Sequence, residues 1–240
     1  MKRYFTIALV SLTLLSSCRM MSGRSVRGDG NVVSQVRNYR DFDGVDVGGA
    51  LDVYIKTDSV YSVKVEADQN LQEFIEVYLD NNTLRIKNAN NTNIDPSKPI
   101  RVYVTAPDLS DLGASGASSI FGTGRITSAG DIDIDLSGAS KIKADLKAPK
   151  ISLHMSGACS GELTGETKDF DIEGSGASDL KAFGLLAENV DVDLSGAGSV
   201  DVYSSVKLTA GTSGAGTIRY KGTGAVSTDI SGAGSVKKVD

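Results

Sequence analysis

Apolar and polar residues alternate in short blocks along the second half of the chain. In one block, Val190–Leu194 reads Val-Asp-Val-Asp-Leu, Ser195–Gly198 reads Ser-Gly-Ala-Gly, and Ser199–Tyr203 reads Ser-Val-Asp-Val-Tyr. Strict alternation is typical of a half-buried β-strand, because successive side chains point to opposite faces. The glycines between the two runs indicate a corner, since glycine adopts backbone angles that other residues avoid. Each block therefore predicts a strand, a corner and a second strand.

The triplet Ser-Gly-Ala at the centre of the block occurs seven times. Successive copies begin 22, 19, 19, 20, 18 and 18 residues apart. A near-constant period of this size is the signature of a stacked repeat architecture, in which one unit is too small to bury its own apolar face. The predicted corner residues are Ser115, Gly116, Ser137, Gly138, Ser156, Gly157, Ser175, Gly176, Ser195, Gly196, Ser213, Gly214, Ser231 and Gly232.

Alignment of the copies on the serine places apolar residues in matched columns. The residue five places before the serine, for example, is Ile132, Ile151, Phe170, Val190 and Leu208 in successive copies. We expect each of these side chains to lie over its equivalent in the next coil, about 4.8 Å away. The columns predict an all-β, right-handed parallel β-helix, since parallel crossovers are right-handed. A series of independent antiparallel hairpins is the alternative, but hairpins need neither a constant period nor matched columns.

The sequence between residues 31 and 107 is rich in predicted strands but lacks the triplet. Phe42–Ile55 has the same order of strand, glycine corner and strand, and is interpreted as a degenerate first coil. We expect one β-helical domain over residues 31–240, with an irregular part (31–107) followed by seven Ser-Gly-Ala coils (108–240). The other predicted elements of the irregular part are strands at Tyr61–Ala67, Ile75–Leu79, Thr83–Lys87 and Ile100–Thr105, and one helical turn at Leu71–Phe74.

The N-terminal residues are typical of an exported lipoprotein. Met1–Cys18 combines a positive start with an apolar run of about a dozen residues, which is too short to span a bilayer. Leu15–Cys18 resembles the lipobox, so Cys18 is the predicted lipidation site and the membrane contact is a lipid anchor only. An ordinary secretory signal that is cleaved nearby is the alternative. Arg19–Gly30 is polar and predicts a flexible tether. Cys159 is the one other cysteine, so no intrachain disulfide is expected after lipidation.

Several of these segments together resemble a known family. Phe42–Ile55, the strand Val63–Ala67 with the following Asp-Gln-Asn-Leu, the strand Thr83–Ile86 and the Ser-Gly-Ala repeats are similar to the family described as "putative autotransporter adhesin, head GIN domain", which is common in lipoproteins of Bacteroidetes. The resemblance covers Val36–Asp240. It implies a β-helical fold and a cell-envelope location, on either the periplasmic or the surface face, and it brings no catalytic motif.

The net charge and the positions of the acidic residues exclude some classes of function and suggest others. The net charge of −5 and the lack of a basic stripe argue against a nucleic-acid partner. Asp171, Glu173, Asp191 and Asp193 fall in outward columns of neighbouring coils and predict an acidic patch. Two interpretations stay open: the carboxylates bind a hard cation such as Ca²⁺, or they form a solvated face screened by salt and lysines.

Other columns predict structural roles. The outward column after the corner alternates in sign (Lys143, Glu162, Lys181, Asp201, Arg219), as a charge ladder between coils would. The serines match no G-x-S-x-G motif and the single histidine is His154, which disfavours a nucleophilic site. The sequence thus predicts a non-catalytic envelope lipoprotein that presents a flat surface to a glycan or an envelope protein. The alternative is a β-helical enzyme that acts on polysaccharides through the acidic patch, with or without calcium.

Overall fold

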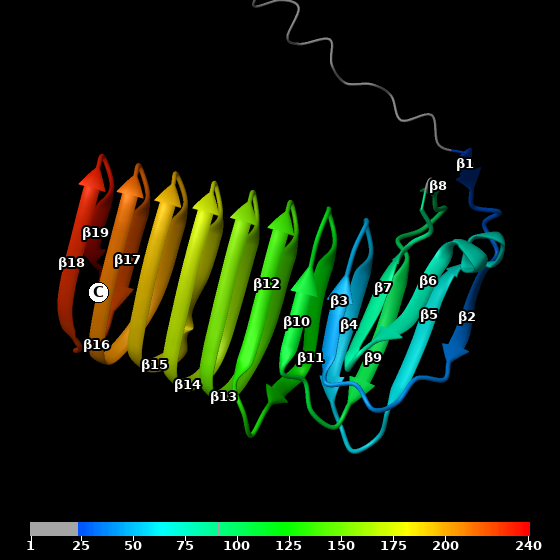
Figure 1. The fold of residues 1–240 in the computed structure, drawn as a ribbon, viewed down its shortest axis with the longest axis horizontal. Coiled ribbons are helices and arrows are strands. Elements are labelled where there is room, and N and C mark those ends of the chain that lie inside the picture. Colours follow the sequence, from blue (N-terminus) through cyan, green and yellow to red (C-terminus); the bar gives the residue numbers. More distant parts are fainter. Residues whose placement is uncertain (1–23, 91) are drawn as a thin grey trace, which may run out of the picture.

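The computed structural model describes residues 24–90 and 92–240. These residues form an all-β solenoid in which parallel strands stack as flattened coils along one axis (Figure 1). The irregular N-terminal part of the chain lies at one end of the stack, and the C-terminal strands lie at the other. The stacked parallel coils confirm the fold class that the repeat predicted. The predicted signal segment Met1–Cys18 lies outside the described residues.

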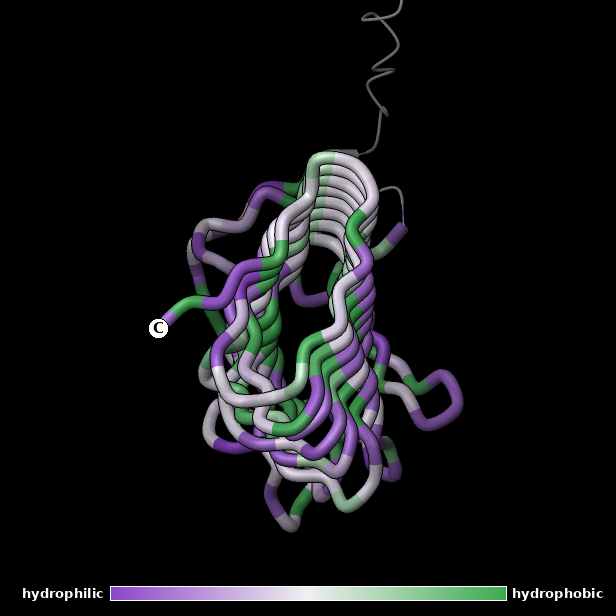
Figure 2. The backbone as a smooth tube through the Cα atoms, turned by 90° about the vertical axis from the view of Figure 1, so that its left-hand side faces the viewer, coloured by the Kyte–Doolittle hydropathy of each residue, from purple (hydrophilic) through white to green (hydrophobic). Residues whose placement is uncertain are grey.

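Four long strands carry the regular part of the solenoid: β13 (Lys141–Gly157), β14 (Ser160–Gly176), β15 (Asp179–Gly196) and β16 (Ser199–Gly214). Each begins after one Ser-Gly-Ala corner and ends at the next. Its first half joins the sheet that leaves the corners, here called sheet 2, and its second half joins the opposite sheet that leads into them, called sheet 1. Figure 2 shows the two walls and the stacked corners in a view along the axis.

Shorter strands continue the same two sheets on either side. Toward the N-terminal end these are β10 (Asp111–Ala114), β11 (Ser119–Thr127) and β12 (Ile132–Gly138). Toward the C-terminal end they are β17 (Thr217–Lys221), β18 (Ala225–Gly232) and β19 (Ser235–Lys238). All of these pair in parallel with the equivalent strand one coil away.

In-register pairing builds the predicted inward columns. Ile151 pairs with Phe170, and Phe170 pairs with Val190, and all three are buried. Where a coil has glycine in such a column, a leucine of the next coil fills the space: a Cβ added to Gly174 would lie 2.6 Å from Leu194 Cδ2. The core is therefore continuous along the axis, as a stacked repeat requires.

The corner glycines are needed for two reasons. Gly157 has a φ of 102°, in the region that residues with a side chain avoid. A Cβ on Gly157 would also lie only 2.5 Å from the carbonyl oxygen of Gly138 in the preceding coil. This close approach lets the corners bond to one another, as in the 2.7 Å hydrogen bond from the Ala158 N–H to the Gly138 carbonyl. The same backbone hydrogen bond recurs from corner to corner, so the triplet forms the turn between the two strands of every coil.

The degenerate first coil is present where the sequence predicted it. β3 (Gly44–Val47) and β4 (Asp52–Thr57) flank Gly48-Gly49-Ala50, and they pair in parallel with β10 and β11. Gly49 has a φ of 103° and its carbonyl accepts a hydrogen bond from the Ala117 N–H. Gly48 and Gly49 thus stand where the later coils have serine and glycine.

Spatial order departs from chain order in the rest of the irregular part. β7 (Thr83–Asn88) and β9 (Arg101–Ala106) pair in parallel with the far edges of β3 and β4, so they form a level of the stack beyond the first coil. The chain then crosses back to β10 on the other side. The first coil is consequently sandwiched between two levels that come later in the sequence.

Antiparallel strands cover the N-terminal end of the stack. β6 (Ile75–Asp80) pairs with β7 in sheet 1, while β5 (Ser62–Asp68) and β2 (Val32–Arg37) extend sheet 2 beyond β9. The 3₁₀ helix η2 (Gln69–Phe74) links β5 to β6 and buries Leu71 and Gln72. This cap replaces the exposed cross-section that a bare solenoid end would present.

The prediction of a flexible tether over Arg19–Gly30 is wrong for the residues of this segment that the structure describes, from Arg24 onward. Arg24–Arg27 forms β1, which pairs in parallel with β8 (Thr92–Asp95). The buried carboxylate of Asp68 accepts hydrogen bonds from the N–H groups of Gly30 and Ser97 at 2.9 and 2.8 Å. Burial alone would raise the pKa of Asp68, but the hydrogen bonds from Ser97 and Gly30 outweigh it and leave that pKa below its usual value. These hydrogen bonds to Asp68 hold the segment that follows β1 against the cap, so this segment is ordered and does not act as a flexible tether.

Candidate functional site: a trough on the outer face of sheet 1

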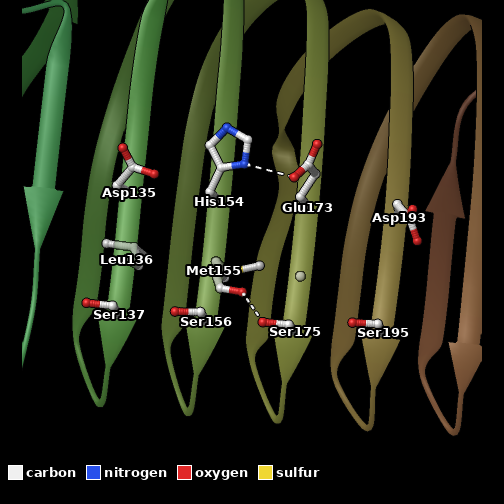
Figure 3. A pocket seen from close by; sticks show the side chains of 11 residues that line it. Asp135, Leu136, Ser137, His154, Met155, Ser156, Glu173, Ser175, Asp193 and Ser195 are labelled. Atoms are coloured by element: carbon white, nitrogen blue, oxygen red, sulfur yellow. Dashed lines mark hydrogen bonds and ion pairs between the residues drawn. The ribbon is translucent and has the colours of Figure 1, made fainter.

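A shallow trough runs along the outer face of sheet 1, parallel to the solenoid axis (Figure 3). Its volume is about 380 Å³. One row of side chains comes from the position two residues before each serine, and a second row is the serines themselves. The two rows are Asp135, His154, Glu173 and Asp193, and Ser137, Ser156, Ser175 and Ser195.

Parallel in-register pairing is the reason for these rows. β12, β13, β14 and β15 contribute one residue each to every row, because Asp135 pairs with His154, His154 with Glu173, and Glu173 with Asp193. Residues about 20 positions apart in the sequence thereby become neighbours at the spacing of adjacent strands, about 4.8 Å. The trough thus presents a regular ladder of hydroxyl, carboxylate and imidazole groups.

The structure brings the predicted acidic patch together. Asp171 pairs with Asp191, and Glu173 pairs with Asp193, across β14 and β15. Two of the four carboxylates have cationic or imidazole partners: Lys150 Nζ lies 2.6 Å from Asp171, and His154 Nδ1 lies 3.3 Å from Glu173 (Figure 3). The hydrogen bond and charge of Asp171 raise the pKa of Lys150. Over the described residues, no group of three or more His, Cys, Asp or Glu side chains is arranged to hold a metal ion.

The serine row has a structural contact of its own. Ser115 Oγ donates to the carbonyl of Val47, and Ser175 Oγ donates to the carbonyl of Met155 in the preceding coil at 3.5 Å. His154 points to Glu173 rather than to a serine hydroxyl (Figure 3). The pairing therefore lacks the arrangement of nucleophile, base and orienting acid that a hydrolytic triad needs. What the trough offers is a set of hydrogen-bond donors and acceptors at regular intervals.

A second acidic cluster, outside the predicted patch, continues the trough toward the N-terminal cap. Asp111 lies beside Asp46, Asp133 and Asp135, and partial desolvation of its carboxylate together with these neighbouring charges raises its pKa. Arg85 reaches across from β7 to form an ion pair with Asp46. Alignment of Gly48 with the corner serines would have placed Asp46 in the same outward column. Nothing in the sequence indicated that β7 would bring Arg85 to it.

The outer face of sheet 2 carries the predicted charge ladder in part. Lys143 Nζ lies 2.8 Å from Glu162, and Arg219 binds both oxygens of Asp201 at 2.6 Å. Toward the cap this face holds a stack of Tyr103, Tyr54 and Phe121, with successive ring centroids 5.2 Å apart. No sequence pattern predicted the stack, because β9 meets β4 only through the reversed order of the irregular part.

Several solved structures of other proteins have a fold similar to that of this chain. A putative adhesin from Bacteroides fragilis NCTC 9343 has 19% sequence identity and a TM-score of 0.85, over 89% of this chain and 100% of that chain. A putative adhesin from Parabacteroides distasonis ATCC 8503 has 24% identity and a TM-score of 0.71, over 90% and 100% of the two chains. A putative lipid binding protein from the same organism has 21% identity and a TM-score of 0.72, with the same coverage. These similarities establish the shared β-solenoid fold.

The family follows from the sequence match. Residues 41–224 match the model of the family described as "Putative auto-transporter adhesin, head GIN domain", and the chain belongs to that family. This confirms the resemblance drawn from the repeats. No curated protein matches the chain. Among the described residues, no helix is both long and apolar enough to cross a membrane.

Proposed function

We propose that the protein is a non-catalytic adhesion module of the bacterial cell envelope, anchored through a lipid on Cys18, that binds an extended glycan along the trough of sheet 1. The observation that carries the proposal is the regular pair of rows over β12–β15, one of serine hydroxyls and one of carboxylates with the imidazole of His154. Extended repeat surfaces suit elongated partners, because each coil offers the same contacts at the same interval. Membership of a family described as adhesins supports the same class of role.

The chemistry of the trough favours a polyhydroxylated partner that is neutral or positively charged. Ser137, Ser156 and Ser195 can donate or accept hydrogen bonds, and Asp193 can accept them from sugar hydroxyls. Because Asp135, Glu173 and Asp193 are acidic, an anionic polysaccharide would be repelled at close range. An open trough without high walls fits the side of a chain rather than a single enclosed sugar.

A glycan array tests the proposal with the full chain, read once with added Ca²⁺ and once with chelator. The trough variant is Glu173→Gln with Asp193→Asn, and the matched control is Glu162→Gln with Asp179→Asn on the opposite sheet. We expect retention of specific glycans by the wild type and the control, and at least a tenfold loss in the trough variant. Equal binding by both variants, or silence of the wild type on all glycans, would overturn the proposal. If the wild type binds glycans with added Ca²⁺ but not with chelator, the carboxylates of the trough act by binding calcium.

A further inference from the structure

The outer edge of the C-terminal coil differs from every other coil. β18 and β19 pair on one side with β16 and β17, and no strand in the described part of the chain pairs with their other side. Val226 and Ile230 on β18 are 41% and 45% exposed, whereas Leu208, which occupies the column of Val226 one coil earlier, is fully buried. Figure 2 looks onto this end of the molecule. A strip of apolar side chains and two rows of backbone hydrogen-bonding groups therefore face solvent there.

The two ends of the solenoid are not complementary. The N-terminal end is closed by the antiparallel strands β2, β5 and β6, so a second copy cannot continue the parallel stack from that side. The two C-terminal coils can face each other, because a two-fold axis makes every strand of one copy antiparallel to the strand opposite it. Such contact closes after two copies and does not grow into a fibre.

The symmetry of the corner sets the register of that contact. With corner over corner about Ala233, β18 of one copy lies opposite β19 of the other. Ile230 then faces Val236 of the second copy on the inward side, and Asp229 faces Lys237 of the second copy on the outward side. Neither Asp229 nor Lys237 has an ion-pair partner among the described residues of its own chain, so both are available. Opposite charges directly across an antiparallel pair are stabilising.

The other two-fold arrangement is disfavoured by charge. It would place β19 opposite β19 and bring Lys237 and Lys238 of both copies together. Like charges directly opposite each other destabilise a strand pair. The charge pattern thus favours the arrangement that places β18 of one copy opposite β19 of the other.

We propose that the C-terminal coil is a self-association surface through which two copies of this chain pair end to end, with β18 against β19 in antiparallel register. The capped N-terminal ends and β1 then lie at the two outer extremities of the dimer. The outer face of sheet 1 of one copy continues into the outer face of sheet 2 of the other. Lysines on edge strands can also serve to prevent pairing, and the experiment below separates the two roles.

Cysteine crosslinking of the full chain tests the register directly. Residues opposite each other in an antiparallel pair have Cα atoms about 4.5–5.5 Å apart, which suits a disulfide. Residues 229 and 237 of one chain lie on opposite sheets, about 10 Å apart with side chains pointing outward, so they cannot bridge within a chain. Both positions are exposed, and neither substitution removes a core contact.

The variants are Asp229→Cys, Lys237→Cys and the two combined, oxidised mildly and examined on a non-reducing gel. We expect a covalent dimer from the double variant alone, and from an equimolar mixture of the two single variants. No dimer from the double variant at high protein concentration would overturn the proposal and assign the lysines to edge protection. Equal crosslinking by the single variants would overturn the register. Circular dichroism of each variant checks that the fold is retained.

Discussion

Replacement of Gly157 by alanine is the most direct test of the corner. The substitution forces a residue with a side chain to a φ of 102°, which costs about 1–3 kcal/mol in a sparsely populated backbone region. The new Cβ would also lie 2.5 Å from the Gly138 carbonyl oxygen, a backbone atom that cannot rotate away. Displacing the two corners to relieve this contact adds about 1 kcal/mol or more. We therefore expect a loss of roughly 3 kcal/mol in the free energy of unfolding.

Gly211 provides a matched control in the same solenoid. It lies inside β16 with no positive φ, and a Cβ there would meet Val192 O at 3.5 Å, an ordinary van der Waals distance. Alanine at this position should stabilise the strand by about 0.5 kcal/mol, because it reduces the entropy lost on folding.

Urea unfolding of both variants, followed by circular dichroism, measures the difference. For a chain of this size, a loss of 3 kcal/mol corresponds to a fall of about 6–12 °C in the melting temperature. If Gly157→Ala and Gly211→Ala shift stability by the same amount, the backbone argument for the corner is refuted.

Two further predictions concern charge. Arg219→Ala should lower the free energy of unfolding by about 2 kcal/mol, because it leaves the Asp201 carboxylate, only 7% exposed, without its bidentate partner. The control is Lys143→Ala, which removes an exposed ion pair and should cost less than about 1 kcal/mol. Equal losses of stability for the two variants in urea unfolding would contradict this prediction. Asp111→Asn should raise the melting temperature at pH 7 but not at pH 3.5. Partial desolvation and neighbouring carboxylates raise the pKa of Asp111 in the folded state. The penalty of its ionised form is therefore absent below the unfolded pKa of about 3.9 and is complete once the pH has risen through the folded pKa. A gain at both pH values would show that the effect is not electrostatic.

The regular coils could be predicted almost completely from the sequence. The columns through Ile151 and Phe170, the corners and the first coil at Phe42–Ile55 all followed from alternation and a near-constant period. The predicted acidic patch of Asp171 and Asp191 also formed, because a parallel register converts a repeat spacing into contact. These features are local or periodic, so each residue carries information about its neighbours in space.

The tertiary structure alone decided how the irregular part is assembled. The strands at Thr83–Asn88 and Arg101–Ala106 were predicted, but alternation is the same for a strand whichever edge it pairs with, and for parallel and antiparallel partners. These strands lie on the N-terminal side of the first coil because they pair with the free edges of β3 and β4. That placement brings Arg85 to Asp46 and closes one end of the solenoid. The sequence by itself thus determined the repeating coil and its columns, since these depend on a period of about 20 residues. Which ends and edges are covered depended on long-range packing, which no local pattern records.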